Sequence, residues 1–247
     1  DLPRPPRPCG DVFMSMSVTD AARGTPRWSI AQRYERSFWS RLGSEIKEGR
    51  REQLDWYKWR ADQLQSRLER VWQKGPLDRV LEIGSGPIGT VSFLEARERH
   101  AVDPLEHFYR TQNALVSLRS PGVTYHDGPG EQLPFESARF SLVVLDNVID
   151  HTFDPTRILN EARRVLIADG LLYLAVNVHT PWGARLHDLM ARLLLDPGHP
   201  FTYTSRALRR TLSATGYTVV DEQVDSYLDA QQADRHAASL TSKVKGY

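Results

Sequence analysis

The stretch "RVLEIGSGPIG", residues 79–89, decides the fold because it joins a strand to a glycine-rich loop. Its first five residues, Arg79–Ile83, have the apolar character of a strand that is covered on both faces. The glycines at 84, 86 and 89 match G-x-G-x-x-G, a turn whose backbone closely approaches a nucleotide. The acidic Glu82 precedes these glycines and Pro87 lies among them, so these two residues have to decide which ligand the loop accepts.

Strands and helices alternate on the C-terminal side of this loop. We predict strands at 79–83, 100–103, 123–126, 140–146, 171–177 and 217–224, with a weaker seventh at 238–245. Helices are predicted at 88–97, 105–118, 154–167, 182–195 and 204–216; Asp154-Pro155 and Thr204 are good helix starts. This alternation predicts an α/β, Rossmann-like fold with a mostly parallel seven-stranded sheet and helices on both faces.

The N-terminal third has a different character. Residues 1–27 are rich in proline and arginine without periodicity and are expected to form a flexible arm. Between residues 44 and 73 the apolar positions recur every three or four residues, which predicts a helix that Gly75-Pro76 ends. We therefore divide the chain into an arm (1–27), a helical cap or extension (28–76) and a cofactor-binding α/β domain (77–247).

Polar residues follow the predicted strands at the edge where an open parallel sheet binds its ligand. Asp103 ends the second strand, 19 residues after Gly84, from where a carboxylate can accept hydrogen bonds from both hydroxyls of a ribose. Glu82 would repel a pyrophosphate, and Pro87 removes a backbone donor that a pyrophosphate needs. The loop is therefore better suited to a nucleoside that carries an ammonium group and a cationic sulfur.

Four segments resemble the class I S-adenosylmethionine-dependent methyltransferases, and within them the methyltransferase type 11 or ubiquinone/menaquinone-methyltransferase-like subgroup. They are "RVLEIGSGPIG", "AVDP", "GEQLPFESARFSLVVLDNVIDH" and "DPTRILNEARRVLIADGLLYLAVN". The resemblance runs from about residue 79 to 177 and implies S-adenosyl-L-methionine as cofactor. It implies these cofactor-binding residues: Glu82, Gly84, Ser85, Gly86, Asp103, Pro104, Gly130, Glu131, Gln132, Asp146 and Asn147. The chain departs from the family at Pro129, where an aspartate is usual, which puts the adenine contact in question.

Methyl transfer to a hydroxyl is helped by a base, and His151 is the candidate because it follows the fourth strand. Asp150 would orient it; alternatively, His151 caps the following helix or shapes the cofactor pocket. No ligand spacing in the sequence demands a metal, and none is expected. The segment 179–203 is expected to be the acceptor-site insertion, and the candidate acceptor contacts are Trp56, Trp182, His187, His199 and Tyr203. They suggest a small polar acceptor such as a sugar or a hydroxylated secondary metabolite, although each also suits plain packing.

Composition indicates in which compartment this activity would take place and which kinds of partner it disfavours. The 247 residues carry a net charge of +1, so no overall field favours nucleic acid or an anionic membrane. No apolar run is long enough to span a bilayer, no signal peptide is visible, and the single Cys9 fits a reducing compartment, which predicts a cytoplasmic protein. The oligomeric state is left open, with a homodimer as one alternative. Other functions that stay open are C- or N-methylation, another reaction of the same cofactor, a non-catalytic cofactor-binding protein and an NAD dehydrogenase.

Overall fold

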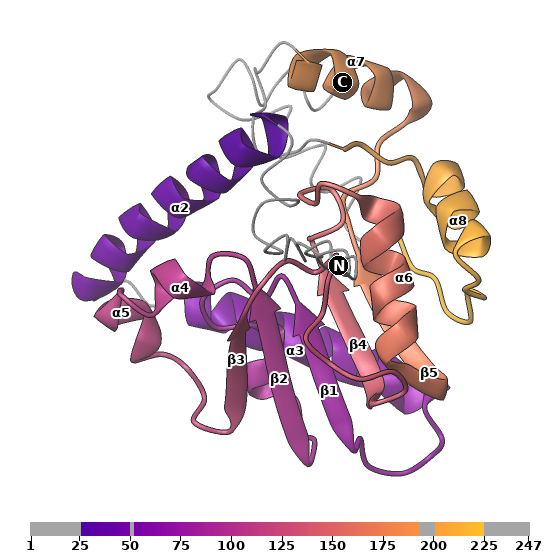
Figure 1. Ribbon diagram of the computed structural model, residues 1–247, viewed down its shortest axis with the longest axis horizontal. Helices are drawn as coiled ribbons and strands as arrows, with labels where there is room; N and C mark the ends of the chain where they lie inside the picture. The colour runs from indigo at the N-terminus through magenta and orange to yellow at the C-terminus, as the bar shows by residue number, and fades with distance from the viewer. Residues whose placement is uncertain (1–25, 50–51, 193–200, 225–247) are drawn as a thin grey trace, which may run out of the picture.

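The structure is a computed structural model that describes residues 26–49, 52–192 and 201–224 of the chain. Its centre is a sheet of five parallel strands in the order β3-β2-β1-β4-β5 (Figure 1). The strands are β1 (Arg79–Ile83), β2 (Glu98–Asp103), β3 (Val123–Asp127), β4 (Phe140–Asp146) and β5 (Leu166–Ala175). The α/β class and the parallel sheet are as predicted, but the described sheet has five strands where the sequence suggested seven.

The order of the strands reverses beside β1, which pairs with β2 on one side and with β4 on the other. Crossovers to the two sides leave a crevice outside the carboxyl ends of these strands, where ligands of open α/β sheets bind. The register pairs Glu82 of β1 with Ala101 of β2 and with Val144 of β4. Glu82, Asp103 and Asp146 therefore come to the same edge of the sheet, as the sequence predicted.

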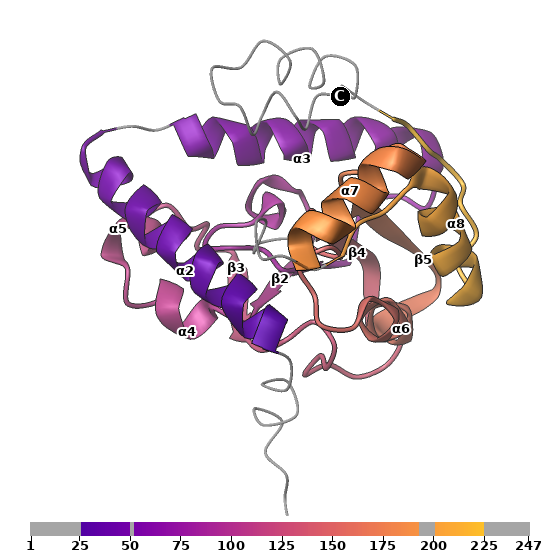
Figure 2. The ribbon, with the colours of Figure 1, turned by 90° about the horizontal axis from the view of Figure 1, so that it is seen from above.

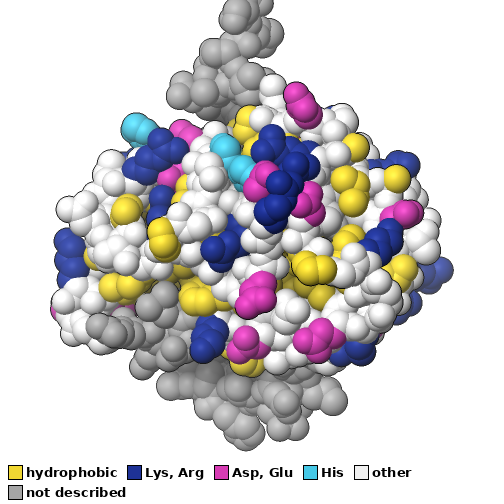
Figure 3. Space-filling model, turned by 90° about the horizontal axis from the view of Figure 1, so that it is seen from below, with side chains coloured by type: hydrophobic (Ala, Val, Ile, Leu, Met, Phe, Trp, Pro, Cys, Tyr) yellow, Lys and Arg dark blue, Asp and Glu magenta, His cyan; other side chains and the backbone are white. Residues whose placement is uncertain are grey.

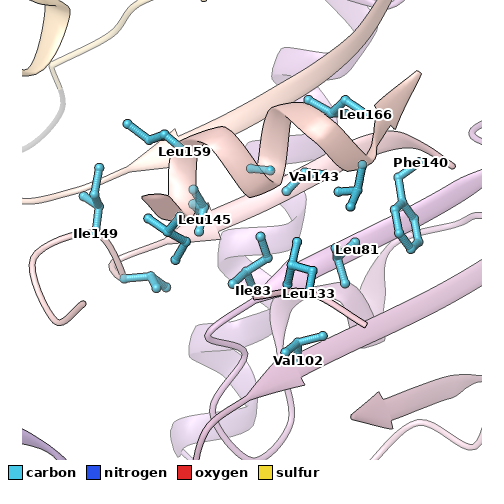
Figure 4. Packing of buried hydrophobic residues seen from close by; sticks show 14 of the residues in the cluster. Leu81, Ile83, Val102, Leu133, Phe140, Val143, Leu145, Ile149, Leu159 and Leu166 are labelled. Atoms are coloured by element: carbon cyan, nitrogen blue, oxygen red, sulfur yellow. The ribbon is translucent and has the colours of Figure 1, made fainter. Parts of the chain in front are cut away.

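Alternate residues of the strands face two hydrophobic layers. On one face Leu81 and Ile83 of β1 pack with the apolar side of α6 (Pro155–Val165), and Figure 4 shows these side chains between sheet and helix. On the other face Val80 packs against Leu64 and Leu68 of α3 (Glu52–Val71). Seen from above, α3 and α6 lie on opposite sides of the sheet (Figure 2). Helix α3 is thus a layer of the α/β fold and buries the same core as the strands.

The role of α3 explains why the helix predicted at 88–97 is wrong. Only Thr90–Phe93 is helical there, as the short 3-10 helix η1, and its Val91 joins the cluster that α3 covers. Because α3 already covers this face, residues 88–97 need not supply a full helix. The helix predicted at 105–118 is likewise reduced to two short helices, α4 (Glu106–Tyr109) and α5 (Asn113–Val116).

The helix predicted from residue 44 is two helices. Helix α2 (Pro26–Lys47) ends before Gly49, whose φ of 89° no helix accommodates, and α3 begins at Glu52. Figure 1 shows α2 crossing above the edge of the sheet where the carboxyl ends lie. The predicted helix starts at residues 154 and 204 are confirmed, because Asp154 caps α6 and Thr204 caps α8 (Ser205–Ala214) through their side chains. Helix α7 spans Pro181–Arg192.

The sixth strand predicted at 217–224 is wrong, since these residues form no strand in the described chain. Val219 and Val220 are exposed, so the apolar alternation that suggested a strand has no sheet to pack on. Ion pairs hold the segment instead: Asp221 binds Arg67 of α3 at 3.1 Å and Glu222 binds Arg209 of α8 at 2.8 Å. The seventh strand, at 238–245, and most of the proposed arm, residues 1–25, lie outside the described residues.

One face of the molecule carries charged side chains of both signs (Figure 3). On the face drawn in Figure 3, positive and negative side chains lie beside one another. Ion pairs of this kind join Glu98, at the start of β2, to Arg79 at 3.2 Å and to Arg139 at 3.5 Å. Across the described ranges, every helix is too short or too polar to serve as a membrane span.

Candidate functional site

A cavity of about 450 Å³ lies at the carboxyl ends of β1, β2 and β4. This volume is within the ordinary range of small-molecule sites. Residues of the sheet edge form its floor, and we call the cavity-facing residues of α2 and α3 the roof. The roof consists of Trp28, Gln32, Tyr34, Glu35, Phe38, Trp39, Trp56 and Tyr57. The cavity therefore joins the glycine loop to an N-terminal segment that lies outside the motif-bearing part of the sequence.

The glycine loop needs glycine for two physical reasons. Gly84 and Gly86 have φ values of 70° and 61°, a region that side chains rarely adopt. A Cβ on Gly84 would lie 2.6 Å from Val148, and one on Gly86 would lie 3.0 Å from the Tyr57 hydroxyl. The loop can therefore pack this closely against Val148 and Tyr57, which also line the cavity, only because it carries no side chain at these two positions.

Glu82 is buried beneath this loop. Its Oε2 accepts a hydrogen bond of 2.7 Å from the backbone N–H of Val91, at the start of η1. Burial raises the pKa of Glu82 to about 8, an effect that the backbone hydrogen bonds only partly offset. A cation bound near Glu82 would favour its ionised form.

Asp103 closes the cavity at the end of β2. Its Oδ2 accepts from the N–H of Gly86 at 2.9 Å and its Oδ1 from the N–H of Leu105 at 2.8 Å. These bonds fix the carboxylate against the glycine loop and leave each oxygen a lone pair for a ligand hydroxyl. Burial is the main cause that raises the pKa of Asp103 to about 7.

Glu131 holds in place the loop that follows β3. Its Oε1 accepts from the N–H groups of Phe153 and Asp154, at 3.0 and 3.3 Å, and so ties this loop to the start of α6. Gly130 must be glycine because a Cβ there would meet Ile158 at 2.5 Å. Pro129, Gly130 and Glu131 line the cavity, whereas the predicted Gln132 is exposed and is not among the lining residues.

The end of β4 forms another part of the wall. Asp146 is almost fully buried and pairs with Arg60 of α3 at 2.9 Å. Burial raises the pKa of Asp146, and the Arg60 guanidinium opposes this rise. Asn147 follows with a φ of 58° and accepts a hydrogen bond from Asn177 of 3.2 Å. The ion pair fastens α3 to the edge of the sheet at the site itself.

His151 lies between two carboxylates. Its Nδ1 is 3.7 Å from Oε1 of Glu35 on α2, and its Nε2 is 3.8 Å from Oδ1 of Asp150. His151 lines the cavity, but Asp150 is buried behind it and is not part of the lining. The predicted pair is therefore adjacent, and a second carboxylate from the roof faces the same ring.

The predicted acceptor residues are not all in one place. Trp56 lines the cavity, whereas Trp182 is 70% exposed and Tyr203 is buried in the core around α6, both apart from the lining. Nothing is described of the His187 side chain, and His199 lies outside the described residues. In the described part of the chain, no group of three or more histidines, cysteines or acids could hold a metal ion.

Sequence reasoning missed the contribution of α2. Trp28, Gln32, Glu35 and Trp39 are spaced by four, three and four residues, which places them on one helix face. That spacing was available in the sequence, but a stripe containing a glutamine and a glutamate resembles a solvated helix face. Tyr57 of α3 was counted as an apolar packing position, and its buried hydroxyl lines the cavity beside Gly86.

Comparisons with known proteins relate the part of the chain that bears the motifs to methyltransferases. A family model described as "Methyltransferase domain" matches residues 81–174. Proteins of Mycobacterium bovis and Mycobacterium tuberculosis, both named as uncharacterized, are 32% identical over 144 residues, 57% of this chain and 47% of theirs. The chain thus spans about half the length of the curated relatives it matches.

Solved structures share the fold. YcgJ from Bacillus subtilis superposes with a TM-score of 0.52 at 21% identity, covering 71% of this chain and 84% of YcgJ. A candidate methyltransferase from Bacillus halodurans gives 0.53 at 22% identity, covering 63% and 69%. A chain from the complex of the Haloferax volcanii Trm112 methyltransferase activator with its methyltransferase gives 0.56 at 17% identity, covering 83% and 91%.

Proposed function

We propose that this protein transfers a methyl group to a small polar molecule, at a hydroxyl, since residues 81–174 match a methyltransferase domain and resemble the class I S-adenosylmethionine-dependent enzymes. One observation carries the proposal. The glycine loop, Asp103 and His151, which come from three different strand ends, line a single cavity of about 450 Å³. We assign the floor of this cavity to the nucleoside and the space under the roof to the acceptor.

The residues present fit S-adenosyl-L-methionine. Gly84 and Gly86 let the loop backbone lie against Val148 and Tyr57 at the cavity, and Asp103 offers carboxylate lone pairs beside it. The other residues expected to hold the cofactor are Glu82, Ser85, Pro104, Gly130, Glu131, Asp146 and Asn147, all of which line the cavity. Carboxylates dominate this wall and suit a ligand that carries ammonium and sulfonium charges.

When bound, S-adenosyl-L-methionine supplies an electrophilic methyl group, which leaves its sulfur as the acceptor oxygen bonds to it. The protein has to align the acceptor, exclude water and receive the hydroxyl proton. The rings of Trp28, Trp39 and Trp56 line the roof and would limit the access of water to a bound cofactor. We assign His151 as the proton acceptor, because its imidazole lines the cavity and its two nitrogens face Glu35 and Asp150.

Calorimetric titration of the full chain with S-adenosylmethionine and S-adenosylhomocysteine tests the first half of this proposal. Binding of both in the micromolar range is expected, and no binding would overturn it. NADH serves as the comparison ligand and should bind more weakly than either. Transfer from tritiated S-adenosylmethionine to a panel of sugars and phenols, with NMR of the product, tests the second half. Methylation at carbon or nitrogen alone would overturn the assignment to oxygen.

A further inference from the structure

The roof carries side chains that are not among the residues expected to bind the cofactor. Its α2 face carries, in order along one side of the helix, the ring of Trp28, the amide of Gln32, the carboxylate of Glu35 and the ring of Trp39. One helical turn separates each from the next. Two aromatic rings therefore flank two polar groups directly above the cavity.

Glu35 differs from the other carboxylates of the cavity. Glu82, Asp103 and Glu131 accept hydrogen bonds from backbone N–H groups, and Asp146 is paired with Arg60. The contact that Glu35 makes is with the imidazole of His151, at 3.7 Å. That separation is too long for a hydrogen bond, so the Glu35 oxygens keep their capacity to accept one.

Gln32 adds a second acceptor one turn away. Its Oε1 is buried and has no hydrogen-bond partner among the described residues. A buried amide oxygen without a donor costs free energy in the empty site, and a ligand donor would recover it. The Glu35 carboxylate and the Gln32 amide oxygen can therefore both accept a hydrogen bond from a ligand.

The aromatic rings are held in place by their own neighbours. Trp28 packs edge-to-face on Phe153 with ring centroids 5.8 Å apart, and Trp39 packs on Tyr109 at 6.1 Å. Rings that are fixed before a ligand arrives lose little entropy on binding it. Tryptophan is also the aromatic side chain that attracts organic cations most strongly.

The charged residues that line the cavity also favour a cationic ligand. Among the described residues that line the cavity there is no lysine and no arginine. An anionic acceptor, such as a phosphorylated or carboxylated compound, would find carboxylates and no counter-charge. An organic cation would find a carboxylate, an amide oxygen and fixed aromatic rings.

We infer that the acceptor is an organic amine, bound as its ammonium form at Glu35 and Gln32, on the face of α2 that also carries Trp28 and Trp39. This rests on the proposed function and deepens it: the methylated hydroxyl and the recognised ammonium belong to one molecule. Glu35 then determines specificity, because it selects the charge of the acceptor.

Three probes that share a phenyl ring and differ in charge test this inference: 2-phenylethylamine, 2-phenylethanol and 3-phenylpropionate. Each is titrated into the full chain at about pH 7.5, where the amine is protonated, with and without S-adenosylhomocysteine. The amine should bind at least about tenfold more tightly than the alcohol, and the propionate most weakly. Equal binding of the three, or tighter binding of the propionate, would overturn the inference.

Two variants test whether Glu35 causes the preference for the amine. Glu35→Gln keeps the size of the side chain and should weaken amine binding about tenfold while leaving alcohol binding unchanged. Glu136→Gln removes an exposed carboxylate outside the cavity lining and should change neither. An unchanged preference in Glu35→Gln would overturn the role of Glu35. Binding of S-adenosylhomocysteine alone is measured in a separate titration. If it does not bind, the methyltransferase proposal is overturned, but the amine preference is not.

Discussion

At the scale of single residues, the site depends on a few groups whose surroundings set their chemistry. His151 lies between Glu35 and Asp150, which come from different elements, so that both ring nitrogens face an acid. A proton taken up by His151 would lie on a ring whose nitrogens are 3.7 and 3.8 Å from carboxylate oxygens. This arrangement is the physical reason for assigning proton transfer to His151.

His151→Ala is expected to lower the rate of methyl transfer by about 100-fold or more, because a positioned base contributes that much. The affinity for S-adenosylhomocysteine should change by less than about twofold, since the imidazole is not needed to hold the nucleoside. Transfer is measured with the best acceptor of the panel and affinity by calorimetry. His107→Ala, an exposed histidine outside the cavity lining, is the control. Undiminished transfer in His151→Ala would remove His151 as the base.

Gly84→Ala is expected to destabilise the protein and to abolish cofactor binding. The new Cβ would lie 2.6 Å from Val148, on a backbone with a φ of 70°. Gly75→Ala separates the two effects, because Gly75 has a φ of 78° but an open space around it. Gly75→Ala should cost only backbone strain, about 1 kcal/mol, whereas Gly84→Ala should cost clearly more in urea unfolding. Equal losses would show that the contact with Val148 is unimportant.

At the scale of elements, two N-terminal helices have different relations to the sheet. Helix α3 is a packed layer, and its Arg60 reaches Asp146 at the end of β4. Helix α2 crosses above the site and supplies most of the roof. One helix therefore stabilises the fold while the other completes the cavity.

Arg60→Met is expected to lower the free energy of unfolding by about 3 kcal/mol, because it leaves the buried Asp146 without its counter-charge. The loss should shrink as the pH falls, since protonation neutralises Asp146 in the folded state. Arg67→Met, two turns along the same helix, removes a more exposed ion pair with Asp221 and should cost less than about 1 kcal/mol. Urea unfolding of both variants measures the difference, and similar losses would contradict the special role of the Arg60 pair.

Elements whose evidence is local were predictable from the sequence. The strands at 79–83 and 140–146 are short, mostly apolar segments, and Asp154-Pro155 marks a helix start by its own chemistry. Predictions failed where a distant segment decides the outcome. Residues 88–97 have a helical pattern, but α3 covers the face such a helix would need. The alternation at 217–224 lacks a sheet edge to join.

Some residues of the candidate site were likewise predictable from the sequence and others were not. Residues at strand ends were predictable, because parallel strands bring their carboxyl ends to one edge. The roof was not, since it depends on where α2 lies relative to the sheet, which no local pattern encodes. Tyr203, predicted to contact the acceptor, is buried in the core around α6, where burial raises its pKa.

At the scale of the whole molecule, the raised pKa values of Glu82 (about 8) and Asp103 (about 7) link protonation to binding and stability. Both carboxyls are protonated in the folded, ligand-free protein near pH 6 but ionised in the unfolded chain. The unfolded state therefore binds fewer protons, and stability should fall as the pH rises from about 4 to about 8.

Binding of S-adenosylmethionine should strengthen over the upper part of that range, from about pH 6 to about pH 8, because its positive charge favours the ionised carboxyls. Protons should be released on binding, which calorimetry detects in buffers of different ionisation enthalpy. Glu82→Gln keeps an acceptor for the Val91 N–H and should reduce both the slope and the proton release. Affinity that is constant across the range, or that falls as the pH rises, would contradict this linkage.

The ion pair between Arg67 and Asp221 has a consequence for how the chain is made. These residues are 154 positions apart, so α3 leaves the ribosome long before its partner exists. At about 5–20 residues per second, this delay is on the order of ten to thirty seconds. The apolar side of α3 waits a shorter time, until β4, which ends at Asp146, has been made. The nascent chain is therefore expected to be most open to chaperones in this interval.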